Sequence, residues 1–370
     1  MKQGKGKIIV AGGIIGFISA LLVKLGNPVN MGICVACFLR DIAGGLGLHG
    51  AGNVQYIRPE ISGFILGSFI IAKMKGEFKA RGGSSPLLRF VLGFFLMIGA
   101  LVFLGCPLRM ILRLANGDLN AVVGLIGYVF GIFIGIQFIK RGFSLGRSVS
   151  QPESNGYIMP VFAVGLLVLL FLKPAFLLFS ENGPGALKAP ALVSLTAGLI
   201  IGIILQRTRL CTAGGFRDAI LIKDFYFLWG LIGIFVFALI GNLALNPESF
   251  KIGFTGQPIA HTDFLWNFLG MVLAGITSAL LGGCPLRQTI LAGEGDADAV
   301  ITVLGLMAGA AFAHNFGLAA SPSGVGINGK IAVIIGFVVV LGIGYNVIQY
   351  NKRIRSRKED LNTKGGEIHA

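Results

Sequence analysis

The chain has 370 residues, of which 54% are hydrophobic and only 13% are charged. Soluble domains carry about twice that share of charged residues, so the composition excludes an ordinary soluble protein and indicates an integral membrane protein. The formal net charge of +15 comes from basic residues scattered over short segments and one tail. This scatter excludes the continuous basic face of a nucleic-acid-binding domain.

Apolar runs of helix-spanning length recur along the chain and predict ten membrane helices in an all-α polytopic fold. The runs lie at about 8–26, 57–74, 86–105, 120–139, 157–179, 191–206, 225–245, 264–283, 299–318 and 330–350. No small-residue cleavage site follows the first run, so we expect a retained helix and not a removed signal peptide. No soluble domain is left over.

Basic residues are concentrated in some connecting segments and nearly absent from others. They gather at Lys2 to Lys7, at Lys73, Lys75, Lys79, Arg81 and Arg89, at Lys140, Arg141 and Arg147, and at Lys352 to Lys358. Segments 180–190, 246–263 and 319–329 carry almost none. Because basic loops stay in the cytoplasm, the pattern predicts a multi-pass protein of the cell inner (cytoplasmic) membrane with both termini cytoplasmic. This topology requires that the short segments around 31–50, 106–118, 207–222 and 284–296 form re-entrant loops or half-helices.

An internal repeat links the two halves of the chain. MGICVACFLRD at 31–41 aligns with TRLCTAGGFRD at 208–218, and LGCPLR at 104–109 aligns with GGCPLR at 282–287, with offsets of 177 and 178 residues. The matched residues are Cys34 with Cys211, Arg40 with Arg217, Asp41 with Asp218, Cys106 with Cys284, Arg109 with Arg287 and Asp118 with Asp296. We therefore expect a first membrane repeat over 1–186, a second over 187–350 and a basic cytoplasmic tail over 351–370.

Each half is predicted to have five spans, so the second half must start on the opposite side of the membrane from the first. The repeats are therefore expected to be inverted, an arrangement in which substrate sites lie near the midplane at the repeat interface. The segments around Cys34 and Cys106 would then enter from outside, and those around Cys211 and Cys284 from the cytoplasm. The four thiols would lie along one axis.

The proline of each GCPLR motif indicates a break in the helix beside the cysteine. Irregular backbone at membrane depth is tolerated only where protein or water satisfies it, so each break should line a cavity. A short helix starting at Pro107 would direct its amide groups and positive dipole end at that cavity, where an anion would bind. Arg109 and Arg287 are costly in hydrocarbon and need a carboxylate partner, water or an anionic ligand.

Paired GCPLR motifs in duplicated halves, with GIC and RLC cysteines ahead of RD, resemble the YeeE/YedE family of sulfur-compound membrane transporters. The stretch CVACFLRD is most similar to the YedE-type branch, which is assigned to selenium transport. The resemblance implies an hourglass-like fold and uptake of a small sulfur oxyanion such as thiosulfate. It also implies a cysteine relay, in which weak S–H···S contacts pass the anion along Cys34, Cys106, Cys211 and Cys284.

Several residues leave alternatives open. Cys37 aligns with Gly214, so the repeat gives it no counterpart and no defined role. The Arg40–Asp41 and Arg217–Asp218 pairs either stabilise the half-helices or line the path of the anion. The histidines lack the spacing of metal ligands, and we expect no metal or other cofactor. We expect the basic tail at 351–370 to be a topology signal and a basic patch that faces the lipid headgroups. The alternative is a docking segment for a cytosolic TusA-like sulfur carrier protein.

Three functions remain. The first is a permease for a small sulfur or selenium anion, without catalytic turnover. The second is a membrane thiol oxidoreductase that uses Cys34 and Cys37 as a C-x-x-C pair. The missing counterpart of Cys37 and the predicted placement of thiols on opposite faces favour permeation over exchange. The third is a generic small-anion channel, which would need no cysteines.

Overall fold

The computed structural model describes residues 4–366, with side chains up to Ile354. Over this range the chain is almost entirely helical, and β1 (Arg81–Gly82) pairs antiparallel with β2 (Val149–Ser150). Eight helical units in the described part are long and apolar enough to cross a membrane by length and composition. The expected all-α polytopic membrane fold is confirmed.

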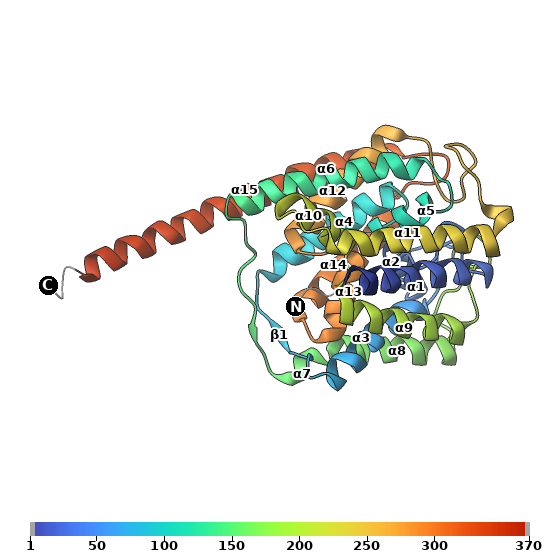
Figure 1. Ribbon diagram of the computed structural model, residues 1–370, viewed down its shortest axis with the longest axis horizontal. Coiled ribbons are helices and arrows are strands. Elements are labelled where there is room, and N and C mark those ends of the chain that lie inside the picture. Colours follow the sequence, from blue (N-terminus) through green and yellow to red (C-terminus); the bar gives the residue numbers. More distant parts are fainter. Residues whose placement is uncertain (1–3, 367–370) are drawn as a thin grey trace.

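Every apolar run that the sequence indicated lies on a helix (Figure 1). These helices are α1 (Lys5–Lys24), α3 (Pro59–Met74), α4 (Pro86–Val102), α6 (Asn120–Lys140), α8 (Ile158–Leu172), α9 (Ala191–Thr208), α11 (Tyr226–Leu245), α12 (Phe264–Leu281), α14 (Ala297–Asn315) and α15 (Ile327–Gly366). The expected run at 157–179 was too long, because α8 ends at Lys173, which has a positive φ of 46° and precedes Pro174.

The four short segments form the helices α2 (Val35–Gly45), α5 (Pro107–Leu114), α10 (Thr212–Leu221) and α13 (Pro285–Glu294). Leu104, at a positive φ of 62°, separates α4 from α5, and Gly282, at 77°, separates α12 from α13 at the matching position. Left-handed backbone cannot continue a right-handed helix. Each GCPLR motif therefore follows a sharp turn, and its proline starts the next helix.

Long helices from the two halves pack in reciprocal pairs. α1 packs along α11 and α3 along α9, while α6 packs along α12 and α4 along α14. Glycines allow these close approaches, since a Cβ on Gly63 would lie 2.7 Å from the Cα of Gly198 in the α3–α9 pair. The repeat offset matches α1 with α9 and α3 with α11. Exchanging the two halves therefore turns the α1–α11 pair into the α9–α3 pair.

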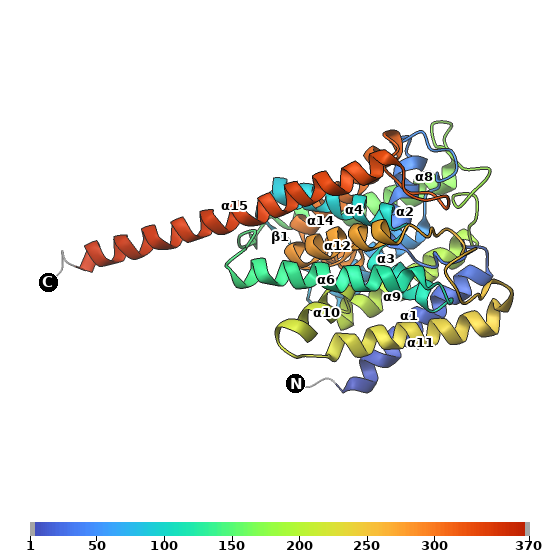
Figure 2. The same cartoon turned by 90° about the horizontal axis from the view of Figure 1, so that it is seen from above.

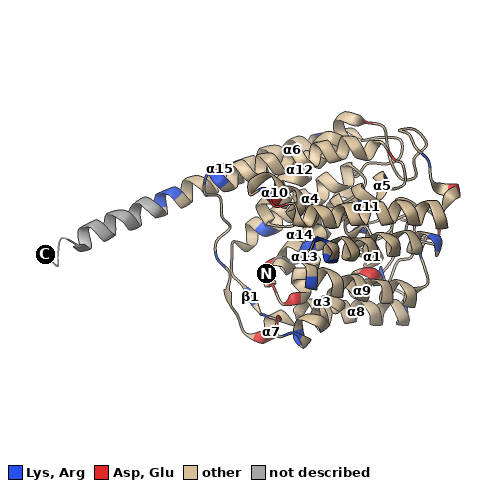
Figure 3. Cartoon of the chain, viewed as in Figure 1, with Lys and Arg blue, Asp and Glu red and all other residues tan. Residues whose placement is uncertain are grey.

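The bundle has two distinct ends. In Figures 1 and 2 the N-terminus and the far end of α15 lie toward the same end, and in Figure 1 α10 and α13 lie nearer that end than α2 and α5. Figure 3 shows α6 and α11 free of charge along most of their length, as helices that face lipid require. The expected tail at 351–370 begins as a continuation of α15. Residues 1–3 and 367–370, and the side chains from position 355 on, lie outside the described part.

The remaining connections brace the short helices. The segment before α4 bonds to the end of α13, where Lys79 N donates to Glu294 O. The segment before α12 bonds to the end of α5, where Lys251 N donates to Asn116 O. Two short elements complete the chain, α7 (Glu153–Gly156) and the 3-10 turn η1 (Pro247–Ser249).

Candidate functional site

Cys34 and Cys106 form the first thiol pair, with their sulfur atoms 3.6 Å apart. Cys34 is the N-cap of α2 and Cys106 is the N-cap of α5, and both are buried. The Cys34 sulfur also accepts a hydrogen bond from the backbone N–H of Cys37. Two helix N-termini, each the positive end of a helix dipole, therefore meet at this pair.

Cys211 and Cys284 form the second thiol pair on the same plan, again with 3.6 Å between the sulfur atoms. Cys211 is the N-cap of α10 and Cys284 is the N-cap of α13. The backbone N–H of Cys284 donates to the Cys211 sulfur at 3.5 Å. All five cysteines of the chain are free thiols. The structure thus groups the four cysteines of the repeat into two pairs.

The glycine of each GCPLR motif makes room for the arginine four residues later. A Cβ on Gly105 would lie 2.6 Å from Cδ of Arg109, and a Cβ on Gly283 would lie 3.0 Å from Cγ of Arg287. A larger residue at either position would push the arginine side chain away from its cysteine. This packing explains why glycine stands in both motifs.

Arg109 is fully buried and lies beside the first thiol pair. Its Nε donates to Asn30 O at 2.6 Å, its Nη2 to Ile259 O at 3.0 Å and its Nη1 to the Cys37 sulfur at 3.3 Å. Both carbonyls belong to residues with positive φ, 62° for Asn30 and 50° for Ile259, which is strained for a β-branched side chain. No carboxylate pairs with Arg109 among the described residues, so its charge is solvated by neutral groups.

Arg287 has a different environment at the second thiol pair. Its Nη2 lies 3.7 Å from Glu294 Oε2, and that buried carboxylate is also 3.4 Å from Nη2 of Arg81. The Nη1 of Arg287 is buried and has no hydrogen-bond partner among the described residues. The carboxylate partner expected for an intramembrane arginine is therefore present at Arg287 and replaced by carbonyls and a thiol at Arg109.

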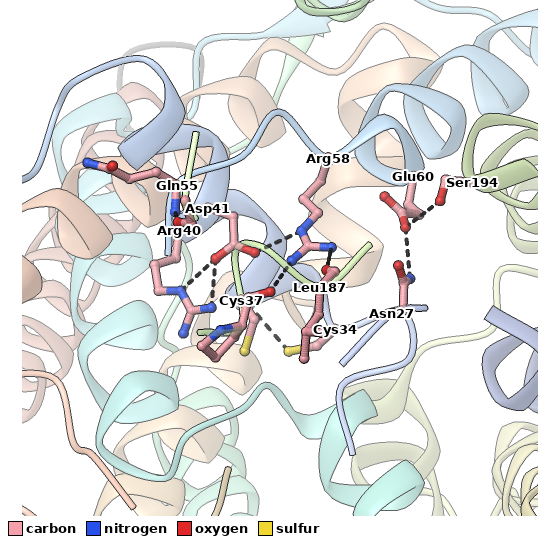
Figure 4. A network of polar contacts seen from close by, with 12 residues as sticks. Asn27, Cys34, Cys37, Arg40, Asp41, Gln55, Arg58, Glu60, Leu187 and Ser194 are labelled. Atoms are coloured by element: carbon pink, nitrogen blue, oxygen red, sulfur yellow. Dashed lines mark hydrogen bonds and ion pairs between the residues drawn. The ribbon is translucent and has the colours of Figure 1, made fainter. Parts of the chain in front are cut away.

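The two Arg–Asp motifs also differ. Asp41 binds two guanidinium groups, with Nη2 of Arg40 at 2.6 Å and Nε of Arg58 at 2.8 Å, and all three side chains are buried (Figure 4). Arg58 also donates to the backbone carbonyls of Pro184 and Leu187. By contrast, Arg217 pairs with Asp218 alone, at 2.8 Å, and the two side chains are 29% and 17% exposed. The first motif thus carries one excess buried positive charge, close to Cys37.

Three buried hydroxyl groups at the second thiol pair were not anticipated from the sequence. Tyr128 on α6, Thr212 on α10 and Ser278 on α12 are each at most 1% exposed. Their oxygens have no hydrogen-bond partner among the described residues. The repeat register could have found them, because the matching positions in the other half are Leu306, Val35 and Ala100.

The histidines serve the connections between helices. His49 Nε2 bonds the Arg40 carbonyl at 3.0 Å, and His261 Nε2 bonds the Val102 carbonyl at 2.8 Å, where α4 ends. Both histidines lie in loops between helices. Burial lowers the pKa of each imidazole ring. They remain neutral at pH 7 and fix the loops that surround the first thiol pair.

A cavity of about 1240 Å³ opens near the second thiol pair, between the start of α1, the end of α9 and the connection from α10 to α11. Thr208 and Arg209, which line it, lead directly into Cys211. Its walls combine apolar side chains with more basic than acidic ones: Lys5, Arg207, Arg209 and Lys223 against Glu77 and Asp224.

Residues 207–353 match the sequence profile of a protein family described as Sulphur transport. Two proteins named thiosulfate transporter TsuA are also similar. The one from Spirochaeta thermophila is 33% identical over 101 residues, which are 27% of this chain and 29% of that protein. The one from Escherichia coli is 29% identical over 104 residues, 28% of each chain. The aligned part thus spans less than a third of either relative. Taken with the paired GCPLR motifs and the all-α membrane fold, these matches support the resemblance of the chain to the YeeE/YedE family.

Proposed function

We propose that the protein is a transporter, and not an enzyme, for a small sulfur or selenium oxyanion of the thiosulfate type. The observation that carries the proposal is the shared construction of the two thiol pairs. At each of them two sulfur atoms lie 3.6 Å apart where two helix N-termini meet. Helix N-termini attract an anion, and thiols are polarisable weak donors that suit a soft terminal sulfur or selenium atom.

Electrostatics supports an anion as the transported species. Arg109 carries a buried charge balanced by no carboxylate in the described part of the chain, and Arg40 and Arg58 share the single charge of Asp41. An anion that reached the first thiol pair would compensate this excess positive charge. Because transport requires weak binding spread over several sites, two thiol pairs at different depths fit a relay better than one tight site.

The relatives bear on the substrate. Two proteins that are similar to about a quarter of this chain are named thiosulfate transporters, which supports thiosulfate as the first substrate to test. A selenium congener has the same tetrahedral form and a larger, more polarisable terminal atom. We include it in the proposed substrate class.

We also infer that residues 1–186 and 187–350 are inverted repeats, with the first thiol pair reached from outside and the second from the cytoplasm. The reciprocal packing of α1 with α11 and of α3 with α9 supports a two-fold relation between the halves. The positions of α2 and α5 toward one end of the bundle and of α10 and α13 toward the other support entry from opposite faces (Figure 1). Both termini would then be cytoplasmic, in the inner membrane.

The cavity beside Cys211 gives the proposed path a cytoplasmic exit. Arg209 and Lys223 in its lining would attract an anion after it leaves the second thiol pair, whereas Arg207 is paired with Glu77. A cytosolic TusA-like sulfur carrier protein could receive the anion there, and we propose this cavity, together with the basic tail, as its docking face.

Uptake by proteoliposomes tests the function. Radiolabelled thiosulfate should enter vesicles containing the wild-type protein, while Cys106→Ala and Cys284→Ala should each lose at least about 90% of the rate, since each breaks one thiol pair. Thr196→Val, which removes an exposed hydroxyl on α9, is the matched control and should transport normally.

If both cysteine variants are inserted and transport thiosulfate at the wild-type rate, the relay is wrong. Equal uptake of chloride and sulfate would then identify a generic anion channel. Turnover of dithiols without uptake, dependent on Cys34 and Cys37, would identify the thiol oxidoreductase instead.

A further inference from the structure

The second thiol pair lies beside a group of buried hydroxyls. Tyr128 lies on α6, which packs along α12, and its ring contacts Phe216 of α10 edge-on. The groups that surround its hydroxyl are the thiols of Cys211 and Cys284 and the hydroxyls of Thr212 and Ser278. Three helices thus bring three hydroxyl groups to one place at the same pair of thiols.

The three hydroxyls lie near one another and near the thiols of Cys211 and Cys284, but not in good hydrogen-bonding geometry. Tyr128 and Ser278 are 0% exposed and Thr212 is 1% exposed, and none of the three oxygens has a hydrogen-bond partner among the described residues. The Nη1 of Arg287, one turn from Cys284, is also buried without a partner. A buried donor without a partner destabilises the fold, so three such hydroxyls beside one thiol pair, with an unpartnered guanidinium nitrogen one turn from Cys284, call for a ligand that they bind.

Folding does not require hydroxyls at these positions. The repeat offset places Leu306, Val35 and Ala100 around the first thiol pair where Tyr128, Thr212 and Ser278 stand around the second. Leu306, Val35 and Ala100 are fully buried, so apolar side chains pack well in the same setting. The polar set therefore belongs to one thiol pair and not to the shared architecture of the halves.

The chemistry of the group fits the oxygen atoms of an anion. Hydroxyl groups and a guanidinium N–H are donors, and the N-termini of α10 and α13 add a positive potential at the same place. Charge-assisted hydrogen bonds from such donors to anionic oxygens are about twice as strong as those between neutral groups. The adjacent thiols offer a softer contact on the other side.

We propose that Tyr128, Thr212, Ser278 and Arg287 form an oxyanion site at the second thiol pair, which binds the oxygen atoms of the substrate while Cys211 and Cys284 contact its terminal chalcogen atom. The proposal rests on the proposed transport function and specifies its substrate. At the first thiol pair the three matching positions carry apolar side chains, and this pair recognises the soft atom. The second recognises both ends, so the substrate must be a chalcogen-terminated oxyanion, such as thiosulfate or its selenium analogue, and not hydrosulfide.

Binding to the purified full-length protein, measured by titration calorimetry with two probes, tests the site. Tyr128→Phe, Thr212→Val and Ser278→Ala should each raise the Kd for thiosulfate roughly tenfold, because each removes a hydrogen bond to a charged oxygen. The Kd for hydrosulfide, which has no oxygen atoms, should change less than about twofold. Tyr345→Phe and Thr196→Val remove exposed hydroxyls elsewhere and should leave both values unchanged.

Thermal unfolding of the ligand-free variants gives an independent measurement. Because each substitution removes a buried unpartnered group, the melting temperature should stay equal to that of the wild type or rise, whereas an ordinary structural hydroxyl would lower it when removed. A raised Kd for thiosulfate in a variant of undiminished stability is the signature of a ligand-binding residue.

The opposite results are distinguishable. If the wild type binds thiosulfate and all three variants bind it equally well, the hydroxyls hold only water and the oxyanion site is wrong, while the transport function stands. An equal loss of thiosulfate and hydrosulfide binding would also overturn the site. It would mean that the hydroxyls position the thiols and do not bind the oxygen atoms of the anion. If the wild type binds no thiosulfate, the proposed function fails and the oxyanion site fails with it.

Discussion

At the first thiol pair the arginine is fully buried and each of its three side-chain nitrogens donates a hydrogen bond, whereas at the second the arginine has a weak carboxylate contact and one buried nitrogen without a partner. At three positions matched by the repeat, the first half-site has apolar side chains where the second has hydroxyls, namely Leu306 for Tyr128, Val35 for Thr212 and Ala100 for Ser278. All four half-helices nonetheless begin after a cysteine at the N-cap, and the sulfur atoms of both pairs are 3.6 Å apart. The comparison teaches that duplication set the backbone plan, and that substitutions around it separated the two pairs into different binding environments.

The largest expected difference between the pairs is the side of the membrane from which they react. A membrane-impermeant thiol reagent added outside should label Cys34 and Cys106, and the same reagent added to inside-out vesicles should label Cys211 and Cys284. Thiosulfate should slow both reactions. Single-cysteine variants analysed by mass spectrometry give the measurement, and the reverse pattern would contradict the inverted topology.

The two Arg–Asp motifs should differ strongly in stability. Asp41→Asn leaves two buried guanidinium groups without their shared carboxylate and should cost about 3 kcal/mol or more of unfolding free energy. Asp218→Asn breaks a partly exposed pair and should cost less than about 1 kcal/mol. Thermal unfolding in detergent compares the two. Equal destabilisation would mean that the buried network is not the structural anchor of the first half.

The arginines should differ more moderately in transport. Arg109→Lys keeps the charge but loses the fork that joins Asn30 O to Ile259 O, and uptake of thiosulfate should fall roughly tenfold. Arg287→Lys loses one contact of 3.7 Å and should reduce uptake only about threefold. Initial rates of uptake in proteoliposomes compare the two variants. A larger loss for Arg287→Lys than for Arg109→Lys would contradict the prediction that Arg109 matters more for transport.

The smallest effect is expected at Cys37, the cysteine without a counterpart in the second half. Cys37→Ala removes one of three contacts to Arg109 and leaves both carbonyl contacts in place, so uptake should fall less than about twofold. A loss comparable to that of Cys106→Ala would instead make Cys37 a member of the relay. Initial rates of thiosulfate uptake in proteoliposomes measure the effect, with Thr196→Val as the control variant.

The sequence by itself determined the membrane class, the positions of the helices and the duplication. Hydrophobic runs must become helices in a bilayer because every backbone donor and acceptor needs an internal partner, and each of the ten runs lies on a helix. The expected count of ten spans was too high by the length and composition of the described helices, since eight units qualify and α3 and α8, with 16 and 15 residues, do not. The proline of each GCPLR motif likewise marked the start of a half-helix, since proline fits the first turn and not the interior.

Only the tertiary structure decided how the site residues combine. The sequence placed four thiols in one series, but their arrangement as two pairs depends on how α2 meets α5 and how α10 meets α13. No local pattern indicated that Arg109 would be held by the carbonyl of Ile259, 150 residues away, or that Asp41 would bind Arg58 as well as Arg40. Tyr128 reads as an ordinary helix residue until packing brings α6 against α10 and α12. Such contacts join segments far apart in the chain, and their geometry is fixed by the packing of whole helices and not by the residues beside them in the sequence.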